Sequence, residues 1–398
     1  MVEAPLRVAI AGAGMVARLH LDAARRAGAR VVGLCASTPG RGKAAAQRFG
    51  LDRSFDSAEE LATSGDVDVV HVCTPNSSHA RLTELALRAG KHVVCEKPLA
   101  TTSEDADALV ALARDSGLVT AVPFVYRYHP MAAEARGRAR DGSLGEIRLI
   151  HGHYLQDWLS APEDNNWRVD PALGGASRAF ADIGSHWCDL VEWVTGHRIS
   201  ELMAQTQTVL PVRAAPGRET FSAARDDGPA ANGGEADGPG RTTVVTEDAV
   251  QVVFRTDRGA AGTLTVSQVS PGRKNRLWFE VDGAAASVAF DQENPESLFV
   301  GSRSGNAVLP RDADLLTPQA ARLSILPPGH PMGYADCFAG FVADVYAAIR
   351  TPARAPGPAD GQPVPDPFPT FADAARTVRL TEAVLRSARS RTWTEVPS

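Results

Sequence analysis

Short apolar runs alternate with amphipathic helical patterns over the first 125 residues of the chain. The apolar runs are rich in Val and Ile, as buried parallel strands are, and they lie at 6–11, 31–35, 67–73, 92–95 and 119–123. Apolar positions at helical spacing predict helices between them, at 16–27, 43–49, 58–62, 78–89 and 104–115. This alternation predicts an α/β domain with a doubly wound parallel sheet, helices on both of its faces, and a ligand site at the C-terminal edge of its strands.

The pattern changes after residue 127. A long strand at 146–158 leads through a Gly/Pro/Asn-rich loop to a helix at 182–195, and further strands follow at 244–256, 262–269, 276–281 and 287–290. We therefore expect an N-terminal domain (1–127) and a second, C-terminal α+β domain (128–370) with a large, mainly antiparallel open sheet. A last helix at 371–388 lies in a C-terminal segment (371–398) that we expect to pack back on the body of the protein.

Two segments contain little that could be buried. The segment 211–241 is rich in Gly, Ala, Pro and Asp, which predicts a mobile surface loop. The segment 351–369 is rich in Pro and predicts a second irregular connection.

Composition narrows the classes of protein. The 398 residues are enough for two domains, and 41 Lys+Arg against 47 Asp+Glu give a net charge of −6, so no basic field for nucleic acid or an anionic membrane is expected. No apolar run approaches the ~20 residues that span a bilayer. The first strand starts almost at Met1, which leaves no room for a signal peptide. Five scattered cysteines predict buried free thiols in a reducing compartment, and hence a cytoplasmic protein.

A glycine-rich turn follows the first strand and opens the first helix. It reads Gly12-Ala13-Gly14-Met15-Val16-Ala17, with Ala17 in the place of the third glycine of a G-x-G-x-x-G pattern. The first glycine permits a tight turn, and Gly14 lets the backbone approach a pyrophosphate at the helix N-terminus. Alone, the motif is also compatible with a purely structural turn, but its position favours a Rossmann domain that binds a nicotinamide dinucleotide through Gly12, Gly14, Met15 and Val16.

The residues at the end of the second strand indicate whether NAD(H) or NADP(H) is bound. An acidic residue is expected there if NAD(H) is bound, because it would hold the ribose 2′-hydroxyl. This chain has Ser37, Thr38 and Arg41 instead, and a small hydroxyl followed by a guanidinium suits a 2′-phosphate. We therefore favour NADP(H), with NAD(H) possible, because Arg41 could also do no more than begin the next helix in solvent.

Two further motifs are more specific. The sequence 74–79, which includes Thr74, Pro75, Asn76 and His79, follows the third strand, and Glu96-Lys97-Pro98 follows the strand after the sequence "GKHV". This pair of motifs resembles the glucose-fructose oxidoreductase/inositol dehydrogenase/rhizopine catabolism (Gfo/Idh/MocA) family, and the resemblance covers nearly the whole chain. It implies that these residues, with Glu96 and Pro98, line the cofactor site, and that Lys97 points at the substrate hydroxyl beside the nicotinamide, aimed in part by a cis bond to Pro98.

Chemistry independent of the resemblance also favours Lys97. A lysine at the C-terminal edge of the sheet, near a cofactor, is partly desolvated and can exchange a proton near neutrality. The alternative is an ordinary surface lysine at a strand end.

A polar stripe marks the helix at 182–195. Asp182, His186 and Asp189 lie on one helical face. From the residues alone, Asp182 could be an N-cap, His186 a satisfied core histidine, or the group a metal-ligand set. The family resemblance implies instead that the D-x-x-x-H pair completes a metal-free active site with the lysine. His186 would then act as acid/base on the reacting hydroxyl, while Asp182 orients the sugar or tunes the histidine.

Several other side chains are typical of a sugar- or cyclitol-oxidising branch of the family. Gln156 can donate to and accept from hydroxyls, and Trp158 can stack on a pyranose ring or simply pack in the sheet. Tyr126 begins the match to a family "NYR" loop in which Val125 stands in the place of the asparagine. The candidates for substrate contact are therefore Lys97, Tyr126, Gln156, Trp158, Arg168, Asp182, His186 and His330.

Together these features predict an NAD(P)-dependent oxidoreductase that acts on a secondary alcohol or ketone of a sugar, glycoside or cyclitol. Two alternatives stay open: an NAD-dependent glycosidase that works by oxidation, elimination and re-reduction, and a non-catalytic dinucleotide-binding regulator. The family resemblance also implies a homo-dimer or homo-tetramer, in which the exposed sheet face of the second domain commonly pairs.

Overall fold

The chain divides into two compact units. The computed structural model describes residues 4–214, 240–351 and 368–397. Unit 1 comprises Met1–Val125 and Tyr334–Ala375, and unit 2 comprises Tyr126–Gly333 and Arg376–Ser398. The segment from Tyr334 therefore groups with the N-terminal unit, whereas the sequence assigned it to the second domain. The reason is that its helix, α10 (Tyr334–Arg350), packs against α1 (Met15–Arg26) of unit 1.

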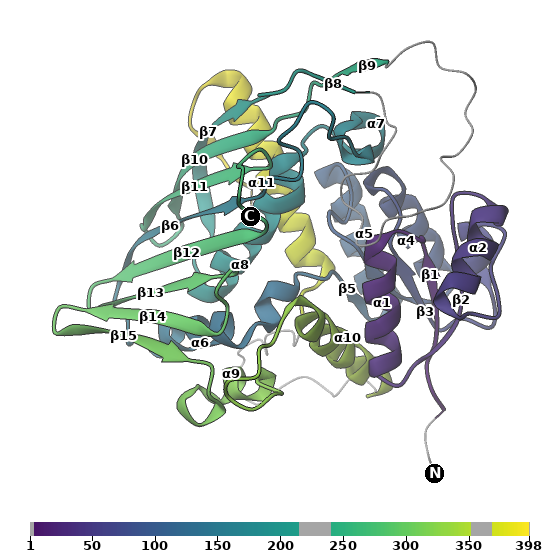
Figure 1. Cartoon of the computed structure of the whole chain (residues 1–398), viewed down its shortest axis with the longest axis horizontal. Coiled ribbons are helices and arrows are strands. Elements are labelled where there is room, and N and C mark those ends of the chain that lie inside the picture. Colours follow the sequence, from purple (N-terminus) through teal and green to yellow (C-terminus); the bar gives the residue numbers. More distant parts are fainter. Residues whose placement is uncertain (1–3, 215–239, 352–367, 398) are drawn as a thin grey trace. The chain divides into compact units, whose positions relative to one another are not determined.

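Unit 1 contains a five-stranded sheet in the order β2-β1-β3-β4-β5 (Figure 1). All its strands are parallel, and the residues of its three central strands are almost all buried. The strands are β1 (Arg7–Ala11), β2 (Arg30–Cys35), β3 (Val69–Val72), β4 (His92–Cys95) and β5 (Thr120–Ala121). The parallel, doubly wound sheet predicted from the sequence is thus confirmed.

The helices of unit 1 lie where right-handed crossovers place them. The connection from β1 to β2 puts α1 on one face of the sheet, where α10 packs against it and where Ala45 and Phe49 of the next helix share its apolar cluster. The crossovers from β3 to β4 and from β4 to β5 run in the opposite direction and use the other face. Thr38, Ser57 and Thr102 cap three of these helices with their hydroxyls. The remaining helices are α2 (Pro39–Phe49), α3 (Ala58–Thr63), η1 (Asn76–Ser78), α4 (His79–Arg88) and α5 (Ser103–Ser116).

Unit 2 contains a nine-stranded sheet in the order β15-β14-β13-β12-β6-β11-β10-β7-β16. Only the β6–β11 pair is parallel, so the predicted mainly antiparallel sheet is confirmed. Its strands are β6 (Ile147–Leu155), β7 (Ile199–Gln207), β10 (Ala249–Thr256), β11 (Ala261–Ser267), β12 (Arg276–Gly283), β13 (Ala286–Asp291), β14 (Ser297–Ser302), β15 (Gly305–Pro310) and β16 (Thr394–Glu395).

Helices cover one face of this sheet. The helices α6 (Pro130–Arg140) and α8 (Ser185–Thr195) pack against the sheet and against each other. The long helix α11 (Phe371–Ser390) begins in unit 1, and its unit 2 part meets β7, where the Ala204 N–H donates to the Ser387 hydroxyl (3.0 Å). The shorter helices of unit 2 are η2 (Val125–Tyr128), η3 (Trp167–Val169), α7 (Pro171–Gly174), η4 (Phe180–Gly184), η5 (Ala313–Leu315) and α9 (Pro318–Leu323).

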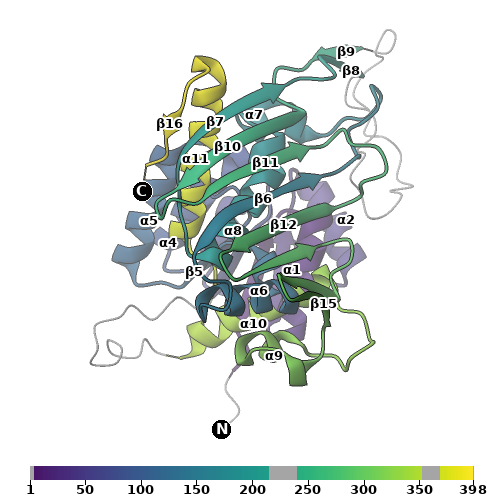
Figure 2. The same cartoon turned by 90° about the vertical axis from the view of Figure 1, so that its left-hand side faces the viewer.

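The opposite face of the sheet is open. Figure 2 shows no described helix in front of it. Along β10 and β11 the burial alternates residue by residue, as expected for a sheet with one packed face. Leu149, Met203 and Val253 are each about two-fifths exposed, at 39%, 39% and 43%.

The irregular segments only partly match the expectation. The two ends of 211–241 form a small antiparallel pair, β8 (Val212–Ala214) with β9 (Arg241–Thr243), whereas the sequence suggested a loop throughout; residues 215–239 lie outside the described residues. Of the Pro-rich connection, 352–367 also lie outside them.

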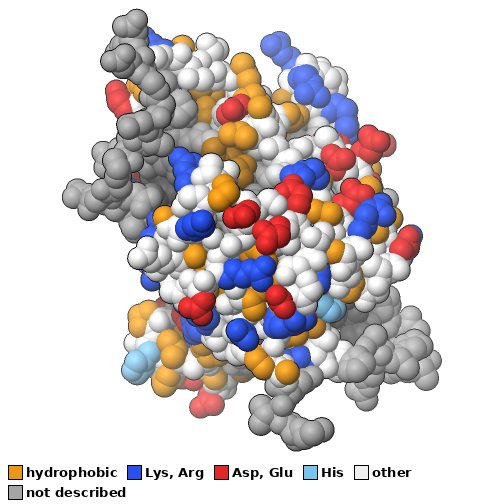
Figure 3. All heavy atoms as spheres, turned by 90° about the vertical axis from the view of Figure 1, so that its right-hand side faces the viewer, with side chains coloured by type: hydrophobic (Ala, Val, Ile, Leu, Met, Phe, Trp, Pro, Cys, Tyr) orange, Lys and Arg blue, Asp and Glu red, His pale blue; other side chains and the backbone are white. Residues whose placement is uncertain are grey.

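Burial and charge complete the description. All five cysteines are buried and free, as predicted. No helix among the described residues is long and apolar enough to cross a membrane. On the face drawn in Figure 3, acidic and basic side chains of the described residues are interspersed.

Candidate active site

The glycine-rich turn of unit 1 has the geometry of an anion cradle. Gly12 has a φ of +127°, and a Cβ there would lie 2.3 Å from the Cys73 carbonyl oxygen, so only glycine fits between β1 and β3. Gly14 is the N-cap of α1; it is exposed, no side chain caps the helix there, and a Cβ would meet nothing within 4 Å. No acidic residue stands in the first turn, which Met15 and Val16 begin. The free N–H groups and the helix dipole suit a pyrophosphate.

The end of β2 presents hydroxyls and a guanidinium. Thr38 caps α2 by accepting from the Arg41 N–H (3.3 Å), and Arg41 Nη1 donates to the Ser37 hydroxyl (3.2 Å). All three side chains are exposed, so they are available to a ligand at this edge of the sheet.

His79 ties the two later cofactor motifs together. Its Nδ1 lies 2.7 Å from the Pro98 carbonyl oxygen, and its Nε2 lies 2.8 Å from the Thr74 carbonyl oxygen. The ring is fully buried, and desolvation lowers its pKa. His79 thus fixes the loop after β3, with Pro75 and Asn76, to the loop after β4; it acts on these loops from within the protein.

Lys97 follows β4 directly and is half-buried. The Lys97–Pro98 peptide bond is cis, as the resemblance implied. The Lys97 N–H donates to Glu96 Oε2 (3.1 Å), and Glu96 is itself buried. The carboxylate of Glu96 is therefore engaged inside the protein.

Asp182 and His186 belong to one helical segment of unit 2. Asp182 lies in a π-helical turn, η4, and His186 lies in the first turn of α8, which continues it. Such π turns inside helices are frequent at functional sites. Asp182 Oδ2 accepts from Gln268 Nε2 (2.8 Å), and its Oδ1 pairs with Arg168 Nε (3.3 Å).

His186 lies among aromatic and polar side chains. It is 7% exposed, and the edge of its ring meets Tyr126 with the ring centroids 5.2 Å apart. His186 follows Asp182 by four residues, so the imidazole and the carboxylate stand about one helical turn apart on the same segment.

Asp189 has a structural role that the polar stripe did not predict. Arg127 binds its carboxylate through Nε (2.8 Å) and Nη2 (2.5 Å), and the two side chains are only 11% and 2% exposed. This bidentate ion pair ties η2, which contains Tyr126, to α8. Asp189, the third residue of the polar stripe, therefore stabilises the fold of unit 2.

A hydrogen-bonded set of hydroxyls and amides lies at the end of β6. The hydroxyls of Tyr126 and Tyr154 are 2.7 Å apart, Tyr154 donates to Asn275 Oδ1 (2.7 Å), and Asn275 Nδ2 donates to Tyr126 (3.0 Å). Gln156 Nε2 donates to the same Asn275 oxygen (2.9 Å), and Trp158 Nε1 donates to Gln156 Oε1 (2.8 Å). The set fixes the orientation of each polar group.

Within unit 2, the structure joins most of the predicted substrate residues and leaves His330 apart from them. Tyr126, Gln156 and Trp158 fall in one hydrogen-bonded set, Tyr126 contacts His186, and Arg168 pairs with Asp182. Trp158 also packs against a small apolar cluster around Leu159, so the packing role is observed. His330 is exposed, and within the described ranges no hydrogen bond or ring contact links its side chain to the others.

Three polar residues of this region were not among the site residues predicted from the sequence: Tyr154, Gln268 and Asn275. Tyr154 is at an inward position of β6, two residues before Gln156, which is the one local signal that could have indicated it. Gln268 lies 86 residues from Asp182 and is directly beyond β11. The local sequence gives no signal for the pairing of Gln268 with Asp182.

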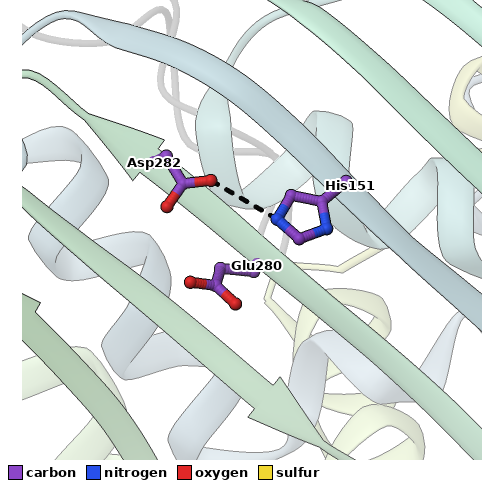
Figure 4. Close-up of side chains that lie close together, drawn as sticks. All are labelled: His151, Glu280 and Asp282. Atoms are coloured by element: carbon purple, nitrogen blue, oxygen red, sulfur yellow. Dashed lines mark ion pairs between the residues drawn. The ribbon is translucent and has the colours of Figure 1, made fainter.

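One group of described residues could hold a metal ion, and it contains none of the predicted site residues. Figure 4 shows His151 of β6 beside Glu280 and Asp282 of β12. His151 Nε2 pairs with Asp282 Oδ2 (3.4 Å), and Ser287 donates to Asp282 Oδ1 (2.6 Å). The contacts of Asp282 with His151 and Ser287 indicate that this group is a polar cluster on the open face of the sheet.

Comparisons with known proteins identify the family of the chain. Residues 6–124 match the oxidoreductase family with an NAD-binding Rossmann fold, GFO_IDH_MocA, and residues 132–289 match the GFO/IDH/MocA C-terminal domain. Levoglucosan dehydrogenase of Pseudarthrobacter phenanthrenivorans is 30% identical over 89% of this chain and 86% of its own length. Inositol 2-dehydrogenase of Rhizobium meliloti is 26% identical over 75% of this chain and 80% of its own length.

Solved structures match over nearly the full length. An oxidoreductase domain protein from Kribbella flavida superposes with a TM-score of 0.84 at 32% identity and covers 100% of both chains. A levoglucosan dehydrogenase complex with NADH and L-sorbose gives a TM-score of 0.84 at 27% identity, with 98% of this chain and 99% of that one covered. With the glycine cradle and the Glu96-Lys97-Pro98 sequence in place, the chain belongs to the Gfo/Idh/MocA family of NAD-binding oxidoreductases.

Proposed function

We propose that the protein oxidises a secondary alcohol of a sugar, glycoside or cyclitol, or reduces the corresponding ketone. When bound, the nicotinamide cofactor supplies the hydride chemistry at its C4 atom. The residues of the chain bind and orient the substrate and move the hydroxyl proton. The similarity to levoglucosan dehydrogenase over most of both chains supports a carbohydrate substrate.

Lys97 and His186 transfer the proton in this proposal. In oxidation, the Lys97 amine, with His186, accepts the proton that leaves the hydroxyl; in reduction the transfer is reversed. Asp182, held by Gln268 and Arg168, orients the substrate hydroxyls or His186. The observation that carries the proposal is Lys97 itself, a half-buried amine at the C-terminal end of β4 in a chain that also keeps the D-x-x-x-H pair.

The hydroxyl and amide groups around Tyr126 suit a polyol or a sugar. Each of the Asn275 and Gln156 amides offers both a donor and an acceptor, and this is the pairing that sugar hydroxyls require. Trp158 and Tyr126 add flat apolar surfaces. His330 is the weakest of the proposed contacts because its side chain is exposed in the loop before α10.

The preferred nucleotide in this proposal is NADP(H). Ser37, Thr38 and Arg41 stand where a ribose-binding acid would favour NAD(H), and a guanidinium binds a phosphate through charge-assisted hydrogen bonds. Levoglucosan dehydrogenase has been solved with NADH, so the two nucleotides must be compared directly. The Arg41→Ala variant should raise KM for NADP⁺ about 10-fold or more and leave KM for NAD⁺ nearly unchanged.

The test is an absorbance screen of sugars, glycosides and inositols with NAD⁺ and NADP⁺ separately. On the best substrate, Lys97→Ala should lower kcat by about 10²–10⁴. Lys91 provides a matched control, since it lies before the same strand and its amine donates to the Val67 carbonyl (2.8 Å). Lys91→Ala should keep wild-type turnover, and equal turnover in the Lys97→Ala variant would refute the assignment.

The same screen separates the two alternatives. A redox-elimination glycosidase would release the aglycone of a glycoside with no net change in nicotinamide absorbance. A non-catalytic regulator would bind the dinucleotide and turn over none of the substrates. Levoglucosan dehydrogenase and inositol 2-dehydrogenase, the two named enzymes described above, support the first function.

We further propose a cytoplasmic homo-dimer or homo-tetramer. The open face of the unit 2 sheet, with Leu149, Met203 and Val253 partly exposed, supports self-association, and five buried free thiols suit a reducing compartment. Light scattering coupled to gel filtration measures the state, and a monomer at micromolar concentration would contradict it.

A further inference from the structure

A chain of buried hydrogen bonds crosses unit 1 and ends at Glu96. Glu96 Oε1 lies 3.0 Å from His20 Nε2, His20 Nδ1 lies 2.7 Å from His71 Nδ1, and His71 Nε2 lies 2.8 Å from the Tyr346 hydroxyl. The four residues come from different places in the sequence: α1, β3, the end of β4, and α10. His20, His71 and Tyr346 are completely buried.

The protons in this chain can be assigned from the partners. Burial alone would raise the pKa of Glu96, but the hydrogen bond from His20 and nearby positive charge lower it overall, so the group is a carboxylate. A carboxylate only accepts, so His20 Nε2 carries the proton of the first bond. Burial lowers the pKa of His71 well below its usual value and raises that of Tyr346, so the imidazole is neutral and the phenol protonated. Tyr346 has no second hydrogen-bond partner within the described part of the chain, so its O–H must donate to His71 Nε2.

All the bonds therefore point the same way. With its Nε2 accepting from Tyr346, His71 carries its one proton on Nδ1 and donates to His20 Nδ1. His20 in turn donates from Nε2 to Glu96. In this arrangement every donor has an acceptor, and the chain ends on an anion, where hydrogen bonds are strongest.

The other oxygen of Glu96 faces Lys97. Oε2 accepts the Lys97 N–H (3.1 Å), so the carboxylate joins the buried chain to the backbone that carries the proposed acid/base. Phe338 of α10 packs its ring edge against His20 with the centroids 4.7 Å apart, so α10 holds the chain by packing as well as by Tyr346. Because both oxygens of the carboxylate are bonded, the position of the Glu96 side chain is fixed, and the bond to the Lys97 N–H restricts the position of the Lys97 backbone.

We propose that Glu96 is a positioning residue for Lys97, and that the chain Tyr346→His71→His20 exists to hold its carboxylate in place. The proposal rests on the proposed function of Lys97. It assigns to α10, more than 200 residues further along the sequence, a part in the placement of the reactive amine.

The first test is Glu96→Gln. Both neighbours of the carboxylate, His20 Nε2 and the Lys97 N–H, are donors, and an amide offers one acceptor and one donor, so one of the two bonds must be lost. Because a misplacement of about 1 Å can lower a rate about 10²-fold, kcat should fall between about 10- and 100-fold. The Kd for the dinucleotide, measured by calorimetry, should change less than about 2-fold, since the glycine turn is untouched.

A double-mutant cycle separates positioning from a general loss of structure. In single-turnover assays, Glu96→Gln should change the residual rate of the Lys97→Ala protein by less than about 2-fold, because the group that it positions is already gone. Glu134→Gln is the matched control and should leave kcat unchanged. Glu134 of unit 2 is also buried, pairs with Arg138 (2.9 Å) and accepts the Thr317 N–H (2.7 Å). Thermal unfolding of each variant is measured alongside.

The outcomes are distinct. Wild-type kcat in Glu96→Gln, or an equal loss in the presence and absence of the Lys97 amine, would overturn the inference while leaving Lys97 catalytic. Wild-type kcat in Lys97→Ala would overturn the proposed function, and this inference with it. If Glu96→Gln does not fold, Tyr346→Phe serves instead; removal of one donor should lower kcat about 2- to 10-fold with an unchanged dinucleotide Kd, and an unchanged kcat would refute the chain.

Discussion

The packing of α8 onto the unit 2 sheet depends on Gly152, and Gly152→Ala tests how far the helix is fixed. A Cβ at position 152 of β6 would lie 2.2 Å from the Trp278 carbonyl oxygen, 2.7 Å from Trp187 Nε1 and 3.0 Å from the Phe279 Cα. Ordinary contacts begin at 3.4 Å, so the carbonyl would have to move by 3.4 − 2.2 = 1.2 Å. Trp187 is the residue after His186, and its indole donates to that same carbonyl (2.9 Å).

Two costs follow from this geometry. Overpacking of a core typically costs about 1–3 kcal/mol. If the strand moves away, the completely buried indole N–H loses its acceptor, which adds about 1–3 kcal/mol. The sum, about 2–6 kcal/mol, should lower the unfolding temperature of a unit of this size by roughly 5–15 °C. Since Trp187 and His186 are neighbours on α8, kcat should also fall about 10-fold or more.

The assay is a thermal melt combined with steady-state kinetics on the substrate found in the screen. Gly65→Ala is the control, because a Cβ there meets nothing within 4 Å and the substitution adds the same atom. If Gly152→Ala melts within about 1 °C of the wild type and keeps its kcat, then the close approach of β6, β12 and α8 does not fix the helix, and the reasoning is wrong.

Three further predictions concern charge and hydrogen bonding. Gln268→Leu removes a donor to the Asp182 carboxylate and should lower kcat about 10- to 100-fold with a smaller effect on dinucleotide Kd; wild-type kinetics would exclude a role for that bond. Arg127→Met leaves the Asp189 carboxylate buried and should destabilise the protein by about 3–5 kcal/mol in denaturant titrations, whereas the double variant Arg127→Met/Asp189→Leu should recover much of it, and an equal loss in both would contradict this. Burial lowers the pKa of His129 to about 3, so the unfolded chain takes up a proton below its pKa of ~6.5 and the native state does not, and stability falls as the pH falls. His129→Asn, which keeps a helix cap, should remove about 2 kcal/mol of the loss between pH 6.5 and ~4.5, and parallel stability–pH curves would refute it.

Much of unit 1 could be predicted from the sequence because its signals are local. A buried parallel strand needs a continuous apolar run, and the run at 92–95 has the same bounds as β4. The turn at Gly12 can also be read locally, from a G-x-G sequence between a strand and a helix, although the Cys73 carbonyl that excludes a Cβ there belongs to a distant part of the chain. Helix caps such as Thr38 act within three residues, so the start of α2 is readable, although the predicted start at 43 came four residues late.

The arrangement of unit 2 could not be predicted in the same way. The parallel pairing of β6 with β11 joins residues more than 100 positions apart, and apolar alternation does not specify the partner strand. The helix α6 was missed because its sequence, PMAAEARGRAR, has no strong apolar stripe, although its first half is buried. The edge strand β15 has almost no buried side chain and so gives no periodic signal.

The candidate site depends both on short local motifs and on contacts between residues that are far apart in the sequence. The residues with reactive groups, Lys97, Asp182 and His186, stand in short motifs that the sequence shows directly. The groups that hold them come from far along the chain: Tyr346 lies 275 positions from His71, and Gln268 lies 86 positions from Asp182. Such partners are selected by packing in the folded state, where a buried polar group without a partner is costly. A chain can therefore keep the motif and lose the supporting groups. We expect such a chain to have a lower kcat than a chain with both, and a similar affinity for the dinucleotide. For this chain, the prediction that distinguishes them is that Glu96→Gln and Gln268→Leu, each in a different unit, both lower turnover while the dinucleotide Kd stays close to that of the wild type.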